Sequence, residues 1–263
     1  MEFEDKQIIY VSSKDRTSGN SSSFLYDLQI NPNNQFDKVV VLSASIPKSY
    51  YLISDDNNEF TLTELNISIT LYIPNGNYTL TSLKAILIET LNSGSPNGWI
   101  YNVAYPNIND INDGKLTFTV INNNNNQPSF QFTEYIYEQM GFNPNTTYTF
   151  NNNILKSVNV INLQLLDAVF INSDICNNKT NSILQEIFSN TDDYSNMIYK
   201  CYSPEAYSKD IANKNGAYKF YLTTKYGNQI NLNGLNWNFT LLLYKQNNLH
   251  SMIKNYLRYL LVQ

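Results

Sequence analysis

Several residue types on which catalysis depends are scarce in this chain of 263 residues. There is one histidine, His250, whereas a metal site needs clustered ligands and a catalytic triad needs a positioned base. No partner with ligand spacing accompanies His250, so we expect it at a surface or helix-cap position. The sequence therefore predicts no catalytic residues, no metal site and no cofactor, and it predicts that the chain is not an enzyme.

Glycine and cysteine are also rare, at nine and two residues. No strand-like segment is followed by the Gly-Lys-Ser/Thr motif that holds phosphates. Cys176 and Cys201 are too few for a disulfide framework, which favours a reduced compartment and leaves open whether the two pair. A nucleophilic thiol needs a basic neighbour, so the favoured interpretation of each is a small buried hydrophobic residue.

Charge is low, since charged residues make up 15% of the chain and the formal net charge is −5. The only arginines are Arg16 and Arg258, and no basic stripe is visible, so direct nucleic-acid binding is not expected. No apolar run reaches the roughly 18 residues that suggest a membrane span, and the first residues lack the apolar stretch of a signal peptide. The Asn-x-Ser/Thr triplets, for instance at Asn66, Asn77 and Asn238, are then expected to stay unglycosylated.

Two acidic segments, 55–59 and 109–114, are rich in oxygen ligands. Neither has the alternating acids and distant glutamate of a calcium loop, so solvated loops are favoured. A carboxylate pair supplied by distant strands, as in glycoside hydrolases, stays open because sequence spacing does not reveal it.

What the sequence does contain is asparagine, at 43 positions, with 21 tyrosines and 13 phenylalanines. An AT-rich genome is the simplest explanation of this bias. The hydrophobic fraction of 42% suffices for a sizeable core. Most aromatic residues are expected in strands, where they fit a pleated, half-buried surface, and a sugar-binding platform built from them stays open.

Alternating apolar and polar residues predict many short strands, separated by turn residues such as Gly227-Asn228 and Asn233-Gly234. The apolar stretch 158–171 predicts one or two further buried strands. The expected strands span 7–12, 24–30, 39–46, 60–65, 67–73, 99–104, 115–121, 129–133, 197–202, 218–224 and 237–244.

Helical spacing is less common. Leucines and isoleucines recur at helical spacing in one segment that Thr79 or Thr81 can cap and that Gly94 ends. Short helices are also expected at 135–140 and 182–188.

A final helix at the C-terminus has an apolar stripe, with Lys254 and Arg258 on its other side. Packing of this stripe on its own sandwich and packing on a neighbouring subunit both stay open. The stripe consists of Leu249, Met252, Ile253, Tyr256, Leu257, Leu260 and Leu261.

The order of these elements indicates the fold class. There is no βαβ rhythm and no repeat of fixed period. We therefore predict an all-β fold, an antiparallel jelly-roll β-sandwich with a few short helices and a C-terminal helix. No composition shift marks a linker, so one domain over 1–263 with elaborated loops is expected, with room for an insertion within 122–155 or 172–216.

Three stretches, in this order, also carry a likeness to one viral family. The first is Ile9-Tyr-Val-Ser-Ser-Lys-Asp-Arg16, leading into 24–30. The second is 39–46 with Pro47-Lys-Ser-Tyr-Tyr51, followed later by Pro74-Asn-Gly-Asn-Tyr78 and its helix. The third is 218–244, which contains Tyr226-Gly-Asn-Gln-Ile-Asn-Leu-Asn-Gly-Leu-Asn-Trp-Asn-Phe-Thr-Leu-Leu-Leu243, and Ile183-Leu-Gln-Glu-Ile187 fits the same setting. Together they resemble the minor capsid, or penton, proteins of virophages and of polinton-like and adintovirus-like DNA viruses.

The resemblance implies a jelly-roll subunit that forms a homopentamer at the five-fold vertices of an icosahedral capsid. Its neighbours would be trimers of a double jelly-roll major capsid protein. It would be located in the virion and assembled in the cytoplasm or nucleus of the host cell. Two rival hypotheses remain: a carbohydrate- or receptor-binding β-sandwich of spike or fibre type, and a hydrolase on a β scaffold.

Overall fold

A computed structural model describes residues 6–30, 36–105, 113–122, 126–132, 136–164, 168–176, 182–189, 191–192, 194–212 and 216–246. The predicted C-terminal helix and His250 lie outside these residues, as do residues 109–112 of the second acidic segment.

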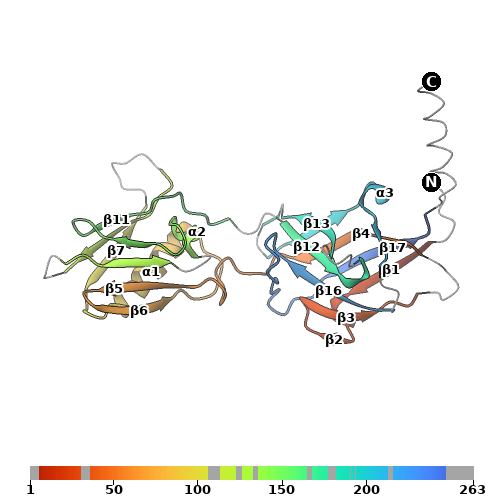
Figure 1. Cartoon of the computed structure of the whole chain (residues 1–263), viewed down its shortest axis with the longest axis horizontal. Helices are drawn as coiled ribbons and strands as arrows, with labels where there is room; N and C mark the ends of the chain where they lie inside the picture. The colour runs from red at the N-terminus through yellow and green to blue at the C-terminus, as the bar shows by residue number, and fades with distance from the viewer. Residues whose placement is uncertain are drawn as a thin grey trace, which may run out of the picture. The chain divides into compact units, whose positions relative to one another are not determined.

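The chain divides into two compact units (Figure 1). Met1–Tyr50 with Leu166–Gln263 forms one, which we call the jelly-roll unit, and Tyr51–Leu165 forms the other, the inserted unit. The sequence led us to expect one domain over 1–263 with an insertion within 122–155 or 172–216, whereas the inserted unit already begins at Tyr51. Both units consist of short alternating strands joined by connections rich in asparagine, so no change of composition marks the boundary.

The jelly-roll unit contains two antiparallel sheets. Its eight main strands, numbered one to eight along the chain, have the orders 1-8-3-6 and 5-4-7-2, which is the jelly-roll topology. The first sheet contains β1 (Lys6–Ser12), β17 (Asn238–Tyr244), β4 (Lys38–Pro47) and β14 (Asn196–Lys200), with β15 (Lys209–Asp210) also paired to β4. The second contains β13 (Ile183–Phe188), β12 (Ala168–Ser173), β16 (Ala217–Thr223), β3 (Ser23–Asp27) and the short β2 (Ser18–Gly19). The predicted all-β, antiparallel jelly-roll fold is confirmed.

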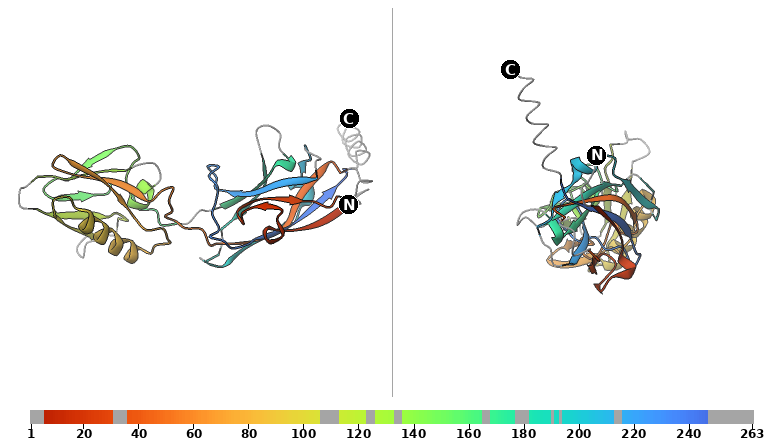
Figure 2. Two further views of the ribbon diagram at one scale, coloured as in Figure 1. Left: turned by 90° about the horizontal axis from the view of Figure 1, so that it is seen from below. Right: turned by 90° about the vertical axis from the view of Figure 1, so that its right-hand side faces the viewer.

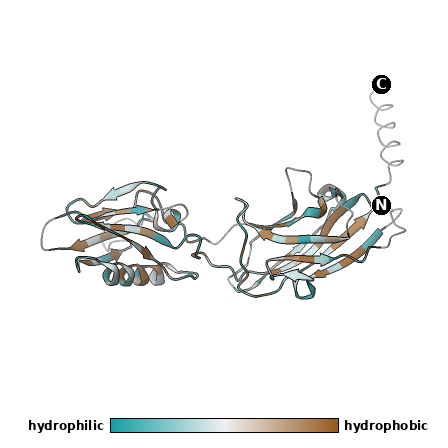
Figure 3. Ribbon diagram, turned by 60° about the horizontal axis from the view of Figure 1, so that its bottom comes forward, coloured by the Kyte–Doolittle hydropathy of each residue, from teal (hydrophilic) through white to brown (hydrophobic). Residues whose placement is uncertain are grey.

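Strands β4 and β17 form the centre of the first sheet. Val41 lies opposite Leu241 and Val39 opposite Leu243, and all four side chains are fully buried between the sheets. Burial of such a side chain stabilises the fold by about 1.5–3 kcal/mol, so this central pair contributes strongly to the sandwich. Figure 3 shows the alternation of hydrophobic and hydrophilic residues along the strands that makes this two-layer packing possible.

Two secondary-structure predictions are wrong. The segment 182–188, expected as a helix, contains strand β13, because pairing with β12 satisfies its backbone and turns Leu184 and Ile187 inward. A short apolar run fits either period, and the deciding partner lies elsewhere in the chain. In the stretch 158–171 the strand begins only at Ala168. Val158 and Val160 are 43% and 61% exposed, so the apolar content of that stretch did not indicate burial.

The described residues of the inserted unit form two further antiparallel sheets and two helices. One sheet has the order β10 (Thr147–Thr149), β9 (Ser129–Phe132), β5 (Glu59–Glu64) and β6 (Ile67–Tyr72). The other has the order β11 (Ile154–Lys156), β8 (Thr117–Ile121) and β7 (Ile100–Ala104). The helices are α1 (Leu80–Gly94) and α2 (Ile136–Met140).

Helix α1 lies along one side of the inserted unit, where it contacts β6 and β7 (Figure 2). Thr79 is its N-cap and forms a capping box with Ser82, so of the two caps that the sequence allowed the structure uses Thr79. Leu83, Leu87 and Leu91 are fully buried at the spacing of one helix face.

The core of the inserted unit is aromatic. Phe130 meets Phe118 and Phe150 edge to face, with ring centroids 5.2 and 5.1 Å apart, and Phe132 stacks on Phe142 at 4.4 Å. Edge-to-face and stacked pairs add about 0.5–1.5 kcal/mol each beyond their buried area. The unit therefore has a hydrophobic core of its own, as an independent domain requires.

One carboxylate lies inside this unit. Glu64 is fully buried and accepts hydrogen bonds from Ser95 Oγ at 2.7 Å, from Tyr101 OH at 2.8 Å and from the Asn97 backbone N–H at 3.0 Å. Burial raises the pKa of Tyr101, and the hydrogen bond to Glu64 raises it further. The carboxylate thus connects the end of β5 to the loop after α1 and to β7.

Candidate functional site

Four connections between strands meet at one end of the jelly-roll unit, which we call the loop end. They span 13–22, 48–50, 189–195 and 224–237, and the inserted unit leaves the jelly-roll unit from the second of them. Loops positioned by a rigid sandwich are the usual place for a binding function.

Ser49 fixes the segment 48–50, from which the chain continues into the inserted unit. Its buried hydroxyl donates to the Leu232 carbonyl at 2.7 Å, and Asn233 Nδ2 donates to the Ser49 carbonyl at 2.6 Å. Asn233 has a φ of 52° and Gly234 a φ of 84°, so this turn needs residues that tolerate the left-handed region. The turn between β16 and β17 is therefore shaped to hold the chain where β4 ends.

Lys48 holds the connection between β13 and β14 against the residues that follow β4. Its backbone N–H donates to the Ser195 carbonyl at 2.8 Å, and its carbonyl accepts from the Tyr194 N–H at 2.9 Å. Its ammonium donates to the Thr191 carbonyl at 2.8 Å. One residue thus binds this loop through both its backbone and its side chain.

Trp237 attaches the connection between β1 and β3. Its indole N–H donates to the Ser21 carbonyl at 2.8 Å, and its backbone N–H donates to Ser13 Oγ at 3.0 Å. The indole is 1% exposed and stacks on Phe239, with ring centroids 4.8 Å apart. Together with Ser49 and Lys48, it makes the loop end a single hydrogen-bonded structure.

Local sequence patterns do not indicate a functional role for Lys48, Ser49, Asn233 or Trp237. Lys48 and Ser49 lie in the motif that starts at Pro47, and Asn233 and Trp237 lie in the motif that starts at Tyr226. The sequence predicts a turn at Asn233-Gly234 and otherwise gives these motifs only a family likeness. Their contact spans more than 180 positions, and local spacing carries no signal of such a contact.

The side of the jelly-roll unit formed by β13 and β14 has an open groove of about 350 Å³. Phe188, Ile198 and Tyr202 are 67%, 58% and 91% exposed, which places large apolar side chains in solvent around it. Apolar surface of this kind at the edge of a sandwich is typical of a contact surface. The groove is lined by Ile187, Phe188, Ile198, Tyr199, Lys200 and Tyr202.

The two cysteines do not pair with each other. Both are free thiols, Cys176 buried and Cys201 partly exposed. Burial raises the pKa of Cys176 to about 11, so the thiol stays protonated at neutral pH and is a poor nucleophile.

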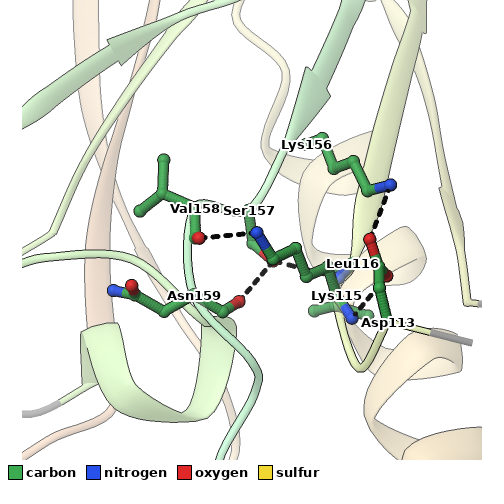
Figure 4. Close-up of polar contacts among 7 residues, drawn as sticks. All are labelled: Asp113, Lys115, Leu116, Lys156, Ser157, Val158 and Asn159. Atoms are coloured by element: carbon green, nitrogen blue, oxygen red, sulfur yellow. Dashed lines mark hydrogen bonds and ion pairs between the residues drawn. The ribbon is translucent and has the colours of Figure 1, made fainter.

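The acidic segments contribute to structure where they are described. Asp55 Oδ1 accepts from Asn75 Nδ2 at 2.7 Å, which holds the first segment against a neighbouring turn. In the second, Asp113 forms an ion pair with Lys156 at 2.8 Å and accepts from the Lys115 N–H at 3.2 Å (Figure 4). The hydrogen bond from Lys156 is the main reason that the pKa of Asp113 lies below its ordinary value.

Two absences hold for the part of the chain that the structure describes. No three His, Cys, Asp or Glu side chains gather there as a metal site would require. Within the same residues, no helix has the length and apolar character needed to cross a membrane.

Comparison with known proteins gives structural neighbours only. No protein-family model and no curated protein matches the sequence. Among solved structures, the chain is similar to the mavirus penton protein, with a TM-score of 0.47 and 10% identity over 92% of this chain and 100% of that one. It is also similar to domains D2–D3 of the flagellar cap protein FliD from Escherichia coli, with a TM-score of 0.23 and 10% identity over 83% of this chain and 98% of that one. The jelly-roll assignment rests on the strand order of the chain itself.

Proposed function

We propose that the chain is a structural capsid protein, a penton subunit that forms homopentamers at the five-fold vertices of an icosahedral DNA virus. Its neighbours in the capsid would be trimers of a double jelly-roll major capsid protein. On this proposal the protein is located in the virion after assembly in the host cytoplasm or nucleus, and it has no catalytic, metal or cofactor site.

The observation that carries the proposal is the jelly-roll strand order, an architecture that capsid subunits commonly use. The three family-like stretches occupy defined places in it. The first includes most of β1 and the turn after it, and the third includes the segment from β16 to β17. The second includes β4 and the residues that lead to the inserted unit, and its later part, Pro74–Tyr78 with α1, lies in the inserted unit. Hydrogen bonds join the first to the third through Ser13 and Trp237, and the second to the third through Ser49 and Asn233. Stretches that are far apart in sequence therefore build one structure, the loop end.

A ring of identical subunits needs two different surfaces on each copy, because head-to-tail contacts close into a ring. The groove beside β13 and β14 supports the proposal as one such surface. Its exposed Phe188 and Tyr202 are of the aromatic type enriched in interfaces.

Native mass spectrometry of the full chain tests the proposal, followed by cryo-electron microscopy of particles made with the major capsid protein. We expect pentamers in solution and density for this chain at the five-fold vertices. A chain that stays monomeric at high concentration, even with the major capsid protein present, would contradict the proposal.

A matched pair of variants tests the groove. Phe188→Asp is expected to shift pentamers toward monomers while the melting temperature stays close to that of the parent. Ile121→Asp alters a side chain of similar exposure, 68%, in the inserted unit and should leave the pentamer intact. Equal effects of the two variants would exclude the groove as a subunit contact.

A further inference from the structure

The first sheet of the jelly-roll unit has apolar residues on both faces. Val40, Leu242 and Tyr244 are buried, yet they form a hydrophobic cluster of their own, apart from the core. They alternate with Val39, Leu241 and Leu243, which point between the two sheets, so the cluster lies on the outer side. We call this side the outer apolar face.

Only one half of the outer apolar face is covered by described residues. On the β4 half, Cys201 packs against the cluster and α3 (Pro204–Tyr207) contacts β4. On the β1 half, Ile8 lies opposite Leu242 and Tyr10 opposite Thr240, so both belong to the same face. They are 50% and 76% exposed. A row of apolar residues thus runs from a covered half into an open half.

The described chain ends near the open half of the outer apolar face, so the C-terminal segment that follows is the candidate to cover it. The Gln246 N–H donates to Asp37 Oδ1 at 2.8 Å, which fixes the chain just beyond the end of β17. Leu249, the first residue of the predicted apolar stripe, is three positions further along and is at most about 10 Å away. Leu242 lies four positions back along the chain, at most about 14 Å away. The tail therefore begins beside the outer apolar face.

The length of the predicted C-terminal helix also agrees with that of β17. A helix over 249–261 would be about 20 Å long, and the seven residues of β17 span about 23 Å. A helix that turned back after Gln246 would run along β17 and β1, with its stripe against Ile8 and Tyr10 and with Lys254 and Arg258 in solvent. Attachment through a short connection gives the chain's own tail an effective concentration in the millimolar range, which favours it over other copies.

We propose that the C-terminal segment docks as a helix on the outer apolar face of its own jelly-roll unit, with its apolar stripe over Ile8 and Tyr10. This face is then occupied by the chain itself and is closed to other copies. The proposal stands independently of the pentamer.

Disulfide trapping in the full chain tests this docking. In a Cys201→Ser background, which removes the partly exposed native thiol, Ile8→Cys is combined with Ile253→Cys on the stripe. The matched control combines Ile8→Cys with Lys254→Cys, one position on and on the other side of the helix. Disulfide geometry is narrow, so a docked helix distinguishes these neighbours. We expect the pair with Ile253 to close within one chain at least tenfold faster than the pair with Lys254.

Hydrogen exchange gives a second measurement that needs no new cysteine. Ile8→Asp should remove the protection of the amides in 249–261, whereas Leu25→Asp, at a 41% exposed position of β3 in the second sheet, should not. Equal closure rates for the two cysteine pairs, or a tail whose exchange does not respond to Ile8→Asp, would overturn the proposal. A disulfide that joins two chains would assign the face to a neighbour's tail and would overturn it as well.

Discussion

The Asn233 side chain and the Ser49 carbonyl, 184 positions apart in the sequence, are joined by a hydrogen bond of 2.6 Å. This bond connects the turn before β17 to the point where the chain leaves for the inserted unit. It is formed inside a set of contacts that includes Lys48 and Trp237, so the loop end behaves as one structure rather than as four separate loops.

Removal of this bond is expected to destabilise the jelly-roll unit. Asn233→Ala leaves the Ser49 carbonyl without that donor and also puts a Cβ-bearing residue with no αL preference at a φ of 52°, so we expect a loss of about 1–3 kcal/mol in urea unfolding. Asn233→Gly loses the same bond but tolerates that φ, and it should cost less. The exposed Asn228→Ala should stay within about 0.5 kcal/mol of the parent. An Asn233→Ala variant as stable as Asn228→Ala would show that the bond does not hold the loop end.

Glu64→Gln tests the buried carboxylate of the inserted unit. The amide of glutamine places an N–H group where the carboxylate accepts from three donors, so one donor loses its partner. We expect a loss of about 1–3 kcal/mol by urea unfolding. Glu89→Gln, at an exposed position of α1, is the control and should have little effect. Equal stability of the two variants would argue against a structural role for Glu64.

Alkaline pH should weaken the fold through buried and partly buried tyrosines. Burial raises the pKa of Tyr101 above its ordinary 10.0, and the pKa values of Tyr78, Tyr199 and Tyr218 shift in the same direction. The folded state then keeps phenolic protons that the unfolded state loses. This contribution to stability is therefore complete below pH 10 and is lost as the pH rises above it.

The measurement is the free energy of unfolding from about pH 9 to pH 11. We expect it to fall across this range, and Tyr101→Phe should make the fall shallower by removing one such proton. An unchanged slope in Tyr101→Phe would mean that Tyr101 does not carry the effect.

The N-cap of α1 gives a prediction with a control in the same turn. Thr79→Ala removes the hydroxyl that accepts from the Ser82 N–H and should cost about 0.5–2 kcal/mol. Thr81→Ala lies inside the helix and is exposed, so it should be neutral or slightly stabilising, because alanine has the higher helix propensity. Thermal unfolding of the two variants compares them directly, and a greater loss in Thr81→Ala would contradict the assigned cap.

Most strands could be predicted from the local alternation of apolar and polar residues. The two wrong predictions, at 182–188 and 158–171, have physical causes. The segment of β13 has apolar residues that fit a helix as well as a strand, and only the distant β12 decides between them. The valines at 158 and 160 are in an apolar stretch but meet no facing layer, so they stay exposed. Hydrophobic content indicates which residues can be buried, and partners from the rest of the chain determine which are.

The contacts of the loop end could not be predicted from local sequence patterns, for a related reason. Lys48, Ser49 and Trp237 bind backbone carbonyls or hydroxyls of loops, and such contacts leave no periodic trace in sequence. The boundary of the inserted unit was hidden as well, because both units use the same residue types and similar strand lengths.

The position of the inserted unit between β4 and β12 has a consequence for the order of folding. The pairing of Val41 with Leu241 closes a loop of about 200 residues, and contacts of such long range slow folding because their closure entropy comes first. A unit with its own aromatic core can fold before that contact forms, and it then replaces a long random coil by a compact body. We therefore expect the inserted unit to fold first and the pairing of β4 with β17 to be the late, slow step by which the jelly roll closes.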